Sequence, residues 1–292
     1  MGSKITLSSS FTAATGKTLQ ADAIMPAAGA LILVDVSHSA GGIGSGVPVN
    51  GAAIPNVAWE QAAAMLGSGT ANTLASAMVN KIQAADGTGE RTPKGGLHVA
   101  MRRDTNTNND RGAYIDCASA IKSYVLANYA THQFYLSLWS RLTRAALSGG
   151  NRKAVIGYGG KFAIEFDLDF VAGGTSAVGP NSLLGSRHPG NVVGNWFYNG
   201  ANPSWYGSAP VNVTEAGIAS MIWGNVREGA AAWNNKASSD VFYRSYVEDL
   251  TVSGRTYAEV DAIDYALWQA AFAAGGKFYG DTFTNPATLA GA

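Results

Sequence analysis

The chain has 292 residues, and its 20 basic residues balance its 20 acidic residues, so the formal net charge is zero. Only 14% of the residues are charged, against an average of roughly 25% in soluble proteins. Glycine contributes 36 of the 292 residues, or about 12%, against an average of roughly 7%. Without a basic excess, binding to nucleic acid or to an anionic membrane is not expected. The hydrophobic fraction of 47% argues against disorder. Because an uncharged molecule has little colloidal repulsion, we expect a protein that works packed in an assembly.

The length fits one large all-β domain or two ordinary domains, and it is ample for a hydrophobic core. Cys117 is the single cysteine, so the fold does not depend on an internal disulfide. Residues 1–8 lack the apolar segment of a secretory signal. The longest apolar run, 23–34, is broken by Pro26 and Gly29, and a membrane-spanning helix needs about 20 residues. We therefore expect a chain made in the cytoplasm, with no membrane insertion.

Alternation of apolar and polar residues predicts strands, because successive side chains point to opposite faces of a sheet. In chain order, strands are expected at 30–36, 97–102, 133–144, 161–171, 194–198, 218–226 and 241–252. Clusters of glycine, asparagine, serine and proline separate them. Helices are expected at 57–66, 119–128 and 257–273, and the stretch 71–85 is ambiguous between helix and strand. Many short strands with glycine turns are typical of a sandwich or a barrel.

The helix over 257–273 has the clearest local signals. Thr256 and Glu259 have the spacing of a capping box. Apolar residues then recur at helical spacing and a glycine pair ends the run, which predicts an amphipathic helix; these residues are Val260, Ile263, Leu267, Ala271, Gly275 and Gly276.

Two strands have well-defined faces. In 133–144, Phe134, Leu136 and Leu138 form an apolar face, and Tyr135, Ser137, Trp139 and Arg141 form the other. In 161–171, five apolar residues face one way and the carboxylates of Glu165, Asp167 and Asp169 face the other.

Three segments carry a resemblance to a known group of proteins. They are Phe-Tyr-Leu-Ser-Leu-Trp-Ser-Arg-Leu-Thr-Arg at 134–144, Tyr-Val-Glu-Asp-Leu-Thr-Val-Ser-Gly-Arg-Thr-Tyr-Ala-Glu at 246–259, and Gly-Lys-Phe-Tyr-Gly-Asp-Thr at 276–282. The segments resemble structural proteins of tailed bacteriophages with a concanavalin A-like (laminin G-like) jelly-roll domain. The resemblance covers mainly residues 115–290.

The resemblance implies an all-β, jelly-roll β-sandwich with a C-terminal amphipathic helix and extended terminal arms. We expect an N-terminal arm at 1–25, the sandwich domain at 26–275 and a C-terminal tail at 276–292, with the arms contacting other subunits. The implied protein is a non-enzymatic virion component of the tail, the neck or the head surface, assembled in the bacterial host cytoplasm. Its partners would be other virion proteins and copies of itself.

The acidic stripe of Glu165, Asp167 and Asp169 raises the question of glycoside hydrolysis. Glucanases of the same broad jelly-roll class carry Glu-x-Asp-x-x-Glu, with the first Glu as nucleophile and the last as general acid. In this chain Phe170 stands at the position of the last Glu, and a phenyl ring cannot protonate a leaving group. We therefore expect no catalytic residues, and a remote or inactive glucanase-like enzyme is the third hypothesis.

Two other interpretations of the stripe remain. The acids would bind sugar hydroxyls in a groove floored by Tyr135 and Trp139 if the two strands are neighbours. Alternatively they are solvated and paired with Arg141 or Lys161.

An asparagine- and glycine-rich region places Trp196, Trp205 and Tyr206 in or beside a loop. Aromatic residues in a loop suggest a contact surface for a protein or a glycan, and local packing is the alternative. The second hypothesis for the whole chain is therefore an adhesin that binds host cell-surface polysaccharide through the sheet face or this loop.

Metal and cofactor signals are weak. The segment 104–110 begins like a calcium loop, but Asn109 replaces the turn glycine and Ile115 the bidentate glutamate. The four histidines are scattered without ligand spacing. Neither a nucleophile motif nor a phosphate-binding loop is complete. We expect no metal and no cofactor.

Overall fold

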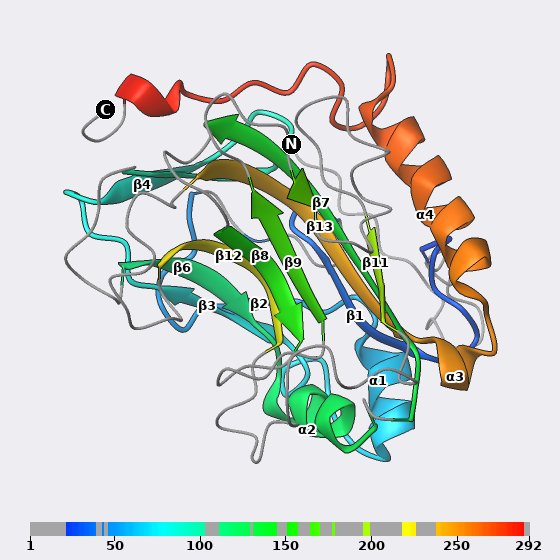
Figure 1. The fold of residues 1–292 in the computed structure, drawn as a ribbon. Helices are drawn as coiled ribbons and strands as arrows, with labels where there is room; N and C mark the ends of the chain where they lie inside the picture. Colours follow the sequence, from blue (N-terminus) through cyan, green and yellow to red (C-terminus); the bar gives the residue numbers. More distant parts are fainter. Residues whose placement is uncertain are drawn as a thin grey trace, which may run out of the picture.

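The computed structural model describes residues 22–38, 43, 46–102, 111–128, 131–144, 151–156, 164–169, 177–178, 195–198, 218–225 and 238–288. In this part of the chain, two antiparallel sheets pack face to face (Figure 1). Helices are few, and a long helix lies near the C-terminus. The prediction of an all-β sandwich with a C-terminal helix is confirmed.

Sheet A contains six strands in the described residues. Along it run β11 (Asn195–Tyr198), β7 (Phe134–Arg144), β13 (Ser239–Asp249), β5 (Leu97–Met101) and β4 (Gly87–Arg91). β1 (Ala30–Asp35) also pairs with β13. β13 pairs with β7 along one edge, while β5 and β1 take successive parts of the other edge. β13 is therefore the strand that ties sheet A together.

Sheet B contains seven strands in the described residues. Their order is β10 (Ala177–Val178), β9 (Ile164–Asp169), β8 (Asn151–Ile156), β12 (Ile218–Asn225), β6 (Arg111–Asp116), β3 (Ser76–Asn80) and β2 (Ala53–Ile54). β3 shows that the ambiguous stretch 71–85 contains a strand.

The helices are α1 (Trp59–Leu66), α2 (Ser119–Asn128), α3 (Leu250–Ser253) and α4 (Tyr257–Phe272), followed by a 3-10 turn at Pro286–Thr288. The capping box of α4 is confirmed: the Glu259 N–H donates to Thr256 Oγ1 at 3.3 Å, and the Thr256 N–H donates to Glu259 Oε2 at 2.7 Å. None of the helices in the described ranges has both the length and the apolar character needed to cross a membrane.

The predicted strand over 241–252 is too long at its C-terminal end. The Asp249 carboxylate accepts from the N–H groups of Thr251 and Val252 at 3.0 and 3.1 Å. Those hydrogen bonds cap the start of a helical turn, so β13 ends at Asp249 and α3 begins.

The main core lies between the two sheets. β7 contributes Phe134, Leu136 and Leu138, as the predicted apolar face requires, and β12 of the opposite sheet contributes Met221 and Trp223. Burial of these side chains is the main favourable term that holds the sheets together.

Sheet A is also covered on its outer face. There Tyr135 of β7 and Tyr246 of β13 pack with Val260 of α4 in a second buried cluster. Trp139, Tyr243 and Phe278 form a third. The alternation predicted for β7 is confirmed, but its second face is buried by α4 and not solvated. Sheet A is thus the middle layer of three (Figure 1).

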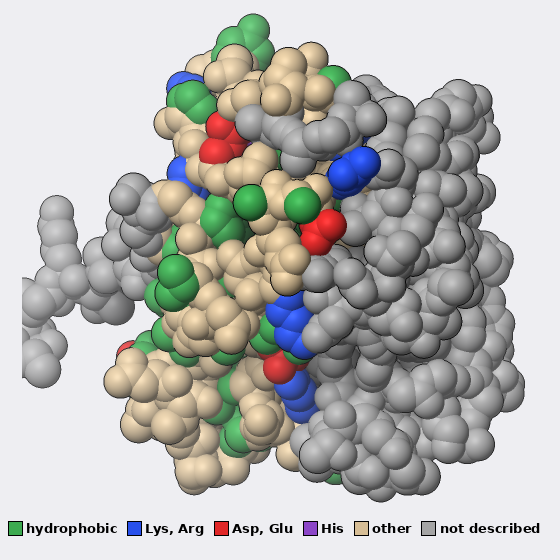
Figure 2. All heavy atoms as spheres, turned by 90° about the vertical axis from the view of Figure 1, so that its left-hand side faces the viewer, with side chains coloured by type: hydrophobic (Ala, Val, Ile, Leu, Met, Phe, Trp, Pro, Cys, Tyr) green, Lys and Arg blue, Asp and Glu red, His purple; other side chains and the backbone are tan. Residues whose placement is uncertain are grey.

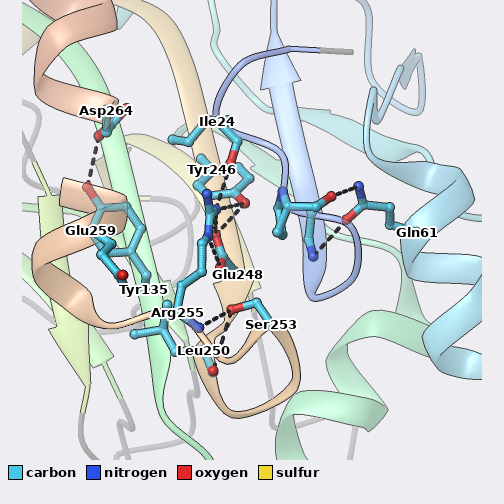
Figure 3. A network of polar contacts seen from close by, with 12 residues as sticks. Ile24, Gln61, Tyr135, Tyr246, Glu248, Leu250, Ser253, Arg255, Glu259 and Asp264 are labelled. Carbon is cyan, nitrogen blue, oxygen red and sulfur yellow. Dashed lines mark hydrogen bonds and ion pairs between the residues drawn. The ribbon is translucent and has the colours of Figure 1, made fainter. Parts of the chain in front are cut away.

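The free edge of β1 is closed by side chains from the segment around α1. Asn56 Oδ1 accepts from the Leu33 N–H at 2.9 Å, and Asn56 Nδ2 donates to the Leu31 carbonyl oxygen at 2.9 Å. Gln61 does the same nearby, accepting from the Ala30 N–H at 3.2 Å (Figure 3). Because an unpaired sheet edge invites pairing with other chains, these two amides protect sheet A at β1.

The expected terminal arms fall partly outside the described residues, since 1–21 are not described. In the part that is described, Ile24 is buried and Asp22 pairs with Arg244. Residues 276–288 lie against sheet A of the same chain (Figure 1). The expected contacts of the arms with other subunits stay a prediction.

The edge contacts of Asn56 generate a stability prediction. Asn56→Leu leaves the Leu33 N–H and the Leu31 carbonyl without their partner, and each buried unpaired group costs about 1–3 kcal/mol. Urea unfolding should show a loss of about 2–4 kcal/mol. The exposed Asn72→Leu is the matched control, expected within about 0.5 kcal/mol of the parent. Equal stability of the two variants would contradict the role given to Asn56.

Candidate functional site

The best-defined polar site lies between α4 and β7, around one buried carboxylate. Asp264 of α4 is 2% exposed. Its Oδ2 accepts from Tyr135 Oη at 3.0 Å and from Ser137 Oγ at 2.6 Å, and its Oδ1 accepts from Trp139 Nε1 at 3.1 Å. The three donors stand at alternate positions of β7, so the strand period places all of them toward the helix. We call these four residues the α4 cluster.

Burial raises the pKa of Asp264 above its ordinary value, although the positive charge of Arg244 and the three hydrogen bonds oppose the shift. Both oxygens of the carboxylate already accept hydrogen bonds from β7. The role of Asp264 is therefore to hold α4 on sheet A.

Arg244 supplies the positive charge beside the α4 cluster. Its Nη1 and Nη2 donate to the two carboxylate oxygens of Asp22 at 2.9 Å each, and its guanidinium lies over the Trp139 ring at 4.8 Å. Burial alone lowers the pKa of Arg244, but the ion pair with Asp22 outweighs it, so the pKa is raised. This bidentate pair fixes the segment before β1 to β13.

A second network closes the other end of α4 (Figure 3). The Tyr246 hydroxyl donates to Glu248 Oε2 at 2.5 Å, and Arg255 Nε donates to Glu248 Oε1 at 2.9 Å. Arg255 Nη2 also donates to the Ile24 carbonyl oxygen at 2.6 Å. Burial and the neighbouring Glu248 raise the pKa of Tyr246. The network joins β13, the turn before α4 and the segment before β1.

The third cluster is partly open to solvent. Asp249 Oδ2 accepts from the Tyr124 hydroxyl at 2.8 Å and contacts His132 Nδ1 at 2.6 Å. The contact of Nδ1 with the Asp249 carboxyl fixes the orientation of the His132 ring. The Asp249 carboxyl is buried, whereas 23% of the His132 side chain is exposed. The buried Asp249 carboxyl thus joins α2, the segment before β7 and the end of β13.

The structure does not form the sugar-binding groove expected across two neighbouring strands. β7, with Tyr135 and Trp139, belongs to sheet A, whereas β9, with Glu165, belongs to sheet B. Tyr135 and Trp139 are 0% and 3% exposed because α4 covers them. Their rings pack in the protein interior, so they cannot floor an open groove.

The remaining predicted residues are placed only in part. Arg141 is half-buried and donates to the Asp281 carbonyl oxygen at 2.9 Å. Glu165, Asp167 and Asp169 lie along β9, where Asp167 stands opposite Arg152 in the register. Trp196 is in β11, opposite Leu136. The side chains of β9 and β11, and the loop with Trp205 and Tyr206, lie outside the described residues, so the loop interpretation stays a prediction.

The segment 104–110, which begins like a calcium loop, lies wholly outside the described residues. Ile115 is buried in β6 as part of the main core. Within the described ranges, no group of three or more His, Cys, Asp or Glu side chains is arranged to hold a metal ion.

Sequence reasoning missed Asp264, Arg244 and Asp249 as the organising polar residues. A signal was present for Asp264, since it falls four residues after Val260 on the inward side of the helix. A charged residue on an apolar helix face indicates a buried partner.

Comparisons with known proteins give a partial likeness in fold. No protein-family model matches the chain, and no curated protein matches it. Two of the solved structures that match are sialidases of Trypanosoma rangeli, one in complex with 2,3-difluorosialic acid as a covalent intermediate and one with sialic acid. The first has a TM-score of 0.36 and 12% identity, the second 0.35 and 10%. Each alignment covers 82% of this chain and 33% of the sialidase chain.

These matches correct one expectation from the sequence. The matched structures are enzymes, which contradicts the expectation that this chain is not an enzyme. At these TM-scores the likeness names no activity for this chain, which spans about a third of the sialidase chains.

The α4 cluster predicts a large effect of one substitution. Asp264→Leu removes the acceptor of three donors from the interior, and each unpaired donor costs about 1–3 kcal/mol. Urea unfolding should show a loss of about 3 kcal/mol or more. Gln269→Leu, on the exposed side of α4, is the control and should change stability by less than about 0.5 kcal/mol. If both variants unfold alike, Asp264 does not hold α4 in place.

The raised pKa of Asp264 gives a prediction for pH dependence. The folded-state pKa lies above the ordinary value of 3.8. The stability that this carboxyl contributes is therefore complete below 3.8 and is lost as the pH rises through the folded-state pKa. Asp264→Asn, which cannot ionise, should lack this component. The difference in unfolding free energy between variant and parent should shift in the variant's favour as the pH rises from 3.8. A pH-independent difference would contradict the assignment.

Proposed function

We propose that this chain is a structural building block of a symmetric assembly and that the assembly belongs to a tailed-phage virion. Its work is to pack against copies of itself and against other virion proteins. The observation that carries the proposal is a surface poor in charge.

The fold removes charge from the surface. The sequence has 20 basic and 20 acidic residues. The buried ones include Asp35, Lys122, Asp240, Arg244, Glu248, Asp249, Asp264 and Asp281. On the face in Figure 2, basic and acidic side chains occupy a minor part of the described surface. A neutral surface with few charges produces little electrostatic repulsion between molecules, which favours association with neighbouring subunits.

The outer side of α4 illustrates the same property. Ala258, Ala262, Ala266 and Ala270 are exposed at a spacing of four residues, so they form one stripe along the helix. Glu259 beside them is engaged in the capping box. Small uncharged side chains allow another backbone to approach closely, and this supports packing between subunits.

The virion part of the proposal rests on the resemblance of three sequence segments. Those segments lie far apart in the chain but side by side in the fold. β7 pairs with β13, the segment after β13 leads into α4, which packs on β7, and residues 276–282 lie over β13. They therefore form one packed unit, which supports treating them as a single domain signature.

Sedimentation velocity tests the self-association. The full chain should show a sedimentation coefficient that rises between about 1 and 100 μM, with little change between about 0.1 and 1 M salt because uncharged surfaces are not screened. Ala266→Glu should shift the association to higher concentration by about tenfold, roughly the effect of 1.4 kcal/mol. Val49→Glu, at a site 73% exposed before β2, is the control. A monomer at every concentration would overturn the assembly proposal.

Mass spectrometry of purified phage particles tests the location. The proposal expects peptides of this chain in intact particles. Their absence would remove the virion assignment and would leave the self-association to be judged by sedimentation.

A further inference from the structure

The C-terminal segment crosses the outer face of sheet A, from the end of α4 toward β4 (Figure 1). Its first part is fixed to its own helix. Phe278 is 2% exposed and packs against Tyr243 and Phe272, with ring centroids at 4.5 and 5.3 Å. Beyond Gly280, the described residues 281–288 lie on the sheet; we call them the strap.

The strap is bound first through the side chain of Asp281, which is 4% exposed. Its Oδ2 accepts from Thr92 Oγ1 at 2.6 Å and from the Tyr243 hydroxyl at 3.1 Å. Its Oδ1 accepts from the Lys94 N–H at 3.0 Å. Two donors from the β4–β5 turn and one from β13 thus converge on one carboxylate.

Two further strap residues, Phe283 and Thr284, are also recognised individually. Phe283 lies between His98, at 5.1 Å between ring centroids, and the Arg141 guanidinium, at 5.1 Å from the ring. Thr284 donates through its N–H and its hydroxyl to the two oxygens of Glu90, at 2.7 Å each. The His98 ring holds Glu90 from the other side, with Nδ1 2.8 Å from Oε1.

The end of the strap is bound through its backbone. Arg144 Nη1 donates to the Pro286 carbonyl oxygen at 3.1 Å. The strand pairings of the described residues do not include the strap. The sheet therefore binds it side chain by side chain, as a peptide-binding surface binds an extended ligand. The strap site consists of Glu90, Thr92, Lys94, His98, Arg141, Arg144 and Tyr243.

The strap leaves the fixed part of the chain at a glycine with a left-handed backbone. Gly280 has φ +66, and a Cβ built there meets no atom within 4 Å. The preceding Tyr279 is 53% exposed, so the link is not packed into the core. The link is a turn that the Asp281 N–H closes on the Phe278 carbonyl oxygen at 3.1 Å. Passing the strap to a second copy would open this one backbone hydrogen bond at the glycine.

From this geometry we infer that the strap site is a joint between copies of this chain, each copy binding the strap of its neighbour. The inference rests on the proposed function and names the surface through which the copies assemble. Because strap and site are carried by every copy, an exchange keeps each contact described above and adds contacts around the hinge. The neutral molecule opposes this approach little.

Disulfide trapping with full-length chains tests the joint. One sample carries Glu90→Cys and the other Thr284→Cys, two positions whose native side chains are in contact. After the samples are mixed, incubated at high concentration and oxidised, the inference expects a disulfide-linked pair on a non-reducing gel. Cys117 should not interfere, since it is buried and burial raises its pKa to about 12.

The matched control mixes Val49→Cys with Thr284→Cys, which reports collisional cross-linking alone. The double variant with both Glu90→Cys and Thr284→Cys reports whether a strap docks in its own chain. Linked pairs above the Val49 level support the joint. Linked pairs no more abundant than in that control, together with an internal disulfide in the double variant, overturn it.

A hinge variant gives a second measurement that does not touch the strap site. Gly280→Ala disfavours the left-handed backbone of the self-docked strap by about 1 kcal/mol. If exchange straightens the hinge, the fraction of linked pairs should rise about fivefold; an unchanged or lower fraction contradicts the inference. Association in sedimentation without linked pairs would refute the joint and leave the proposed assembly standing, whereas no association would refute both.

Discussion

The three-layer architecture depends on a carboxylate that a helix presents to a sheet. Asp264 faces β7, where Tyr135, Ser137 and Trp139 stand at alternate positions and donate to it. Burying those polar groups without a common acceptor would be costly, and burying the carboxylate without them would be more so. Their mutual satisfaction allows α4 to cover sheet A, and with this cover Tyr246, Tyr243 and Phe278 enter the interior. The helix is therefore an integral layer of the fold and not an appendage.

The same preference for internal pairing runs through sheet A. Asp22 with Arg244, Glu248 with Arg255 and Asp249 with His132 are joined by side-chain contacts within the chain. Pairs of this kind contribute more to a specific arrangement than to net stability, because desolvation offsets their attraction. They keep several of the few charged side chains of this sequence away from the surface. The proposed packing of subunits draws on that property at the alanine stripe of α4, whereas the proposed strap joint uses charged side chains such as Glu90 and Arg141.

Prediction from sequence succeeded where the signal is local. Strands with regular alternation, such as β7 and β9, were found because side chains of a strand alternate between two faces with a period of two. The start of α4 was found because Thr256 and Glu259 cap it within three residues. It failed where pairing decides the structure: β4 is Gly-Thr-Gly-Glu-Arg and shows no apolar alternation, yet it forms against β5. It also failed at the end of β13, where the Asp249 side chain turns the chain into α3. For the candidate site, the face of Tyr135 and Trp139 was predicted correctly, but the surface that meets it was not.

The sequence by itself determined the sheet-rich class, the two faces of β7, the capped C-terminal helix and the scarcity of charge, because composition, period and caps are properties of neighbouring residues. Only the tertiary structure decided which sheet each strand joins and what covers each face. Ala30 pairs with Glu248 across most of the chain, and β7 and β9 are assigned to different sheets. Alternation states that Tyr135 and Trp139 share a face, but it does not state whether water, sugar or a helix lies against that face. That choice is made by residues more than a hundred positions away, such as Asp264, and it turned an expected binding surface into interior.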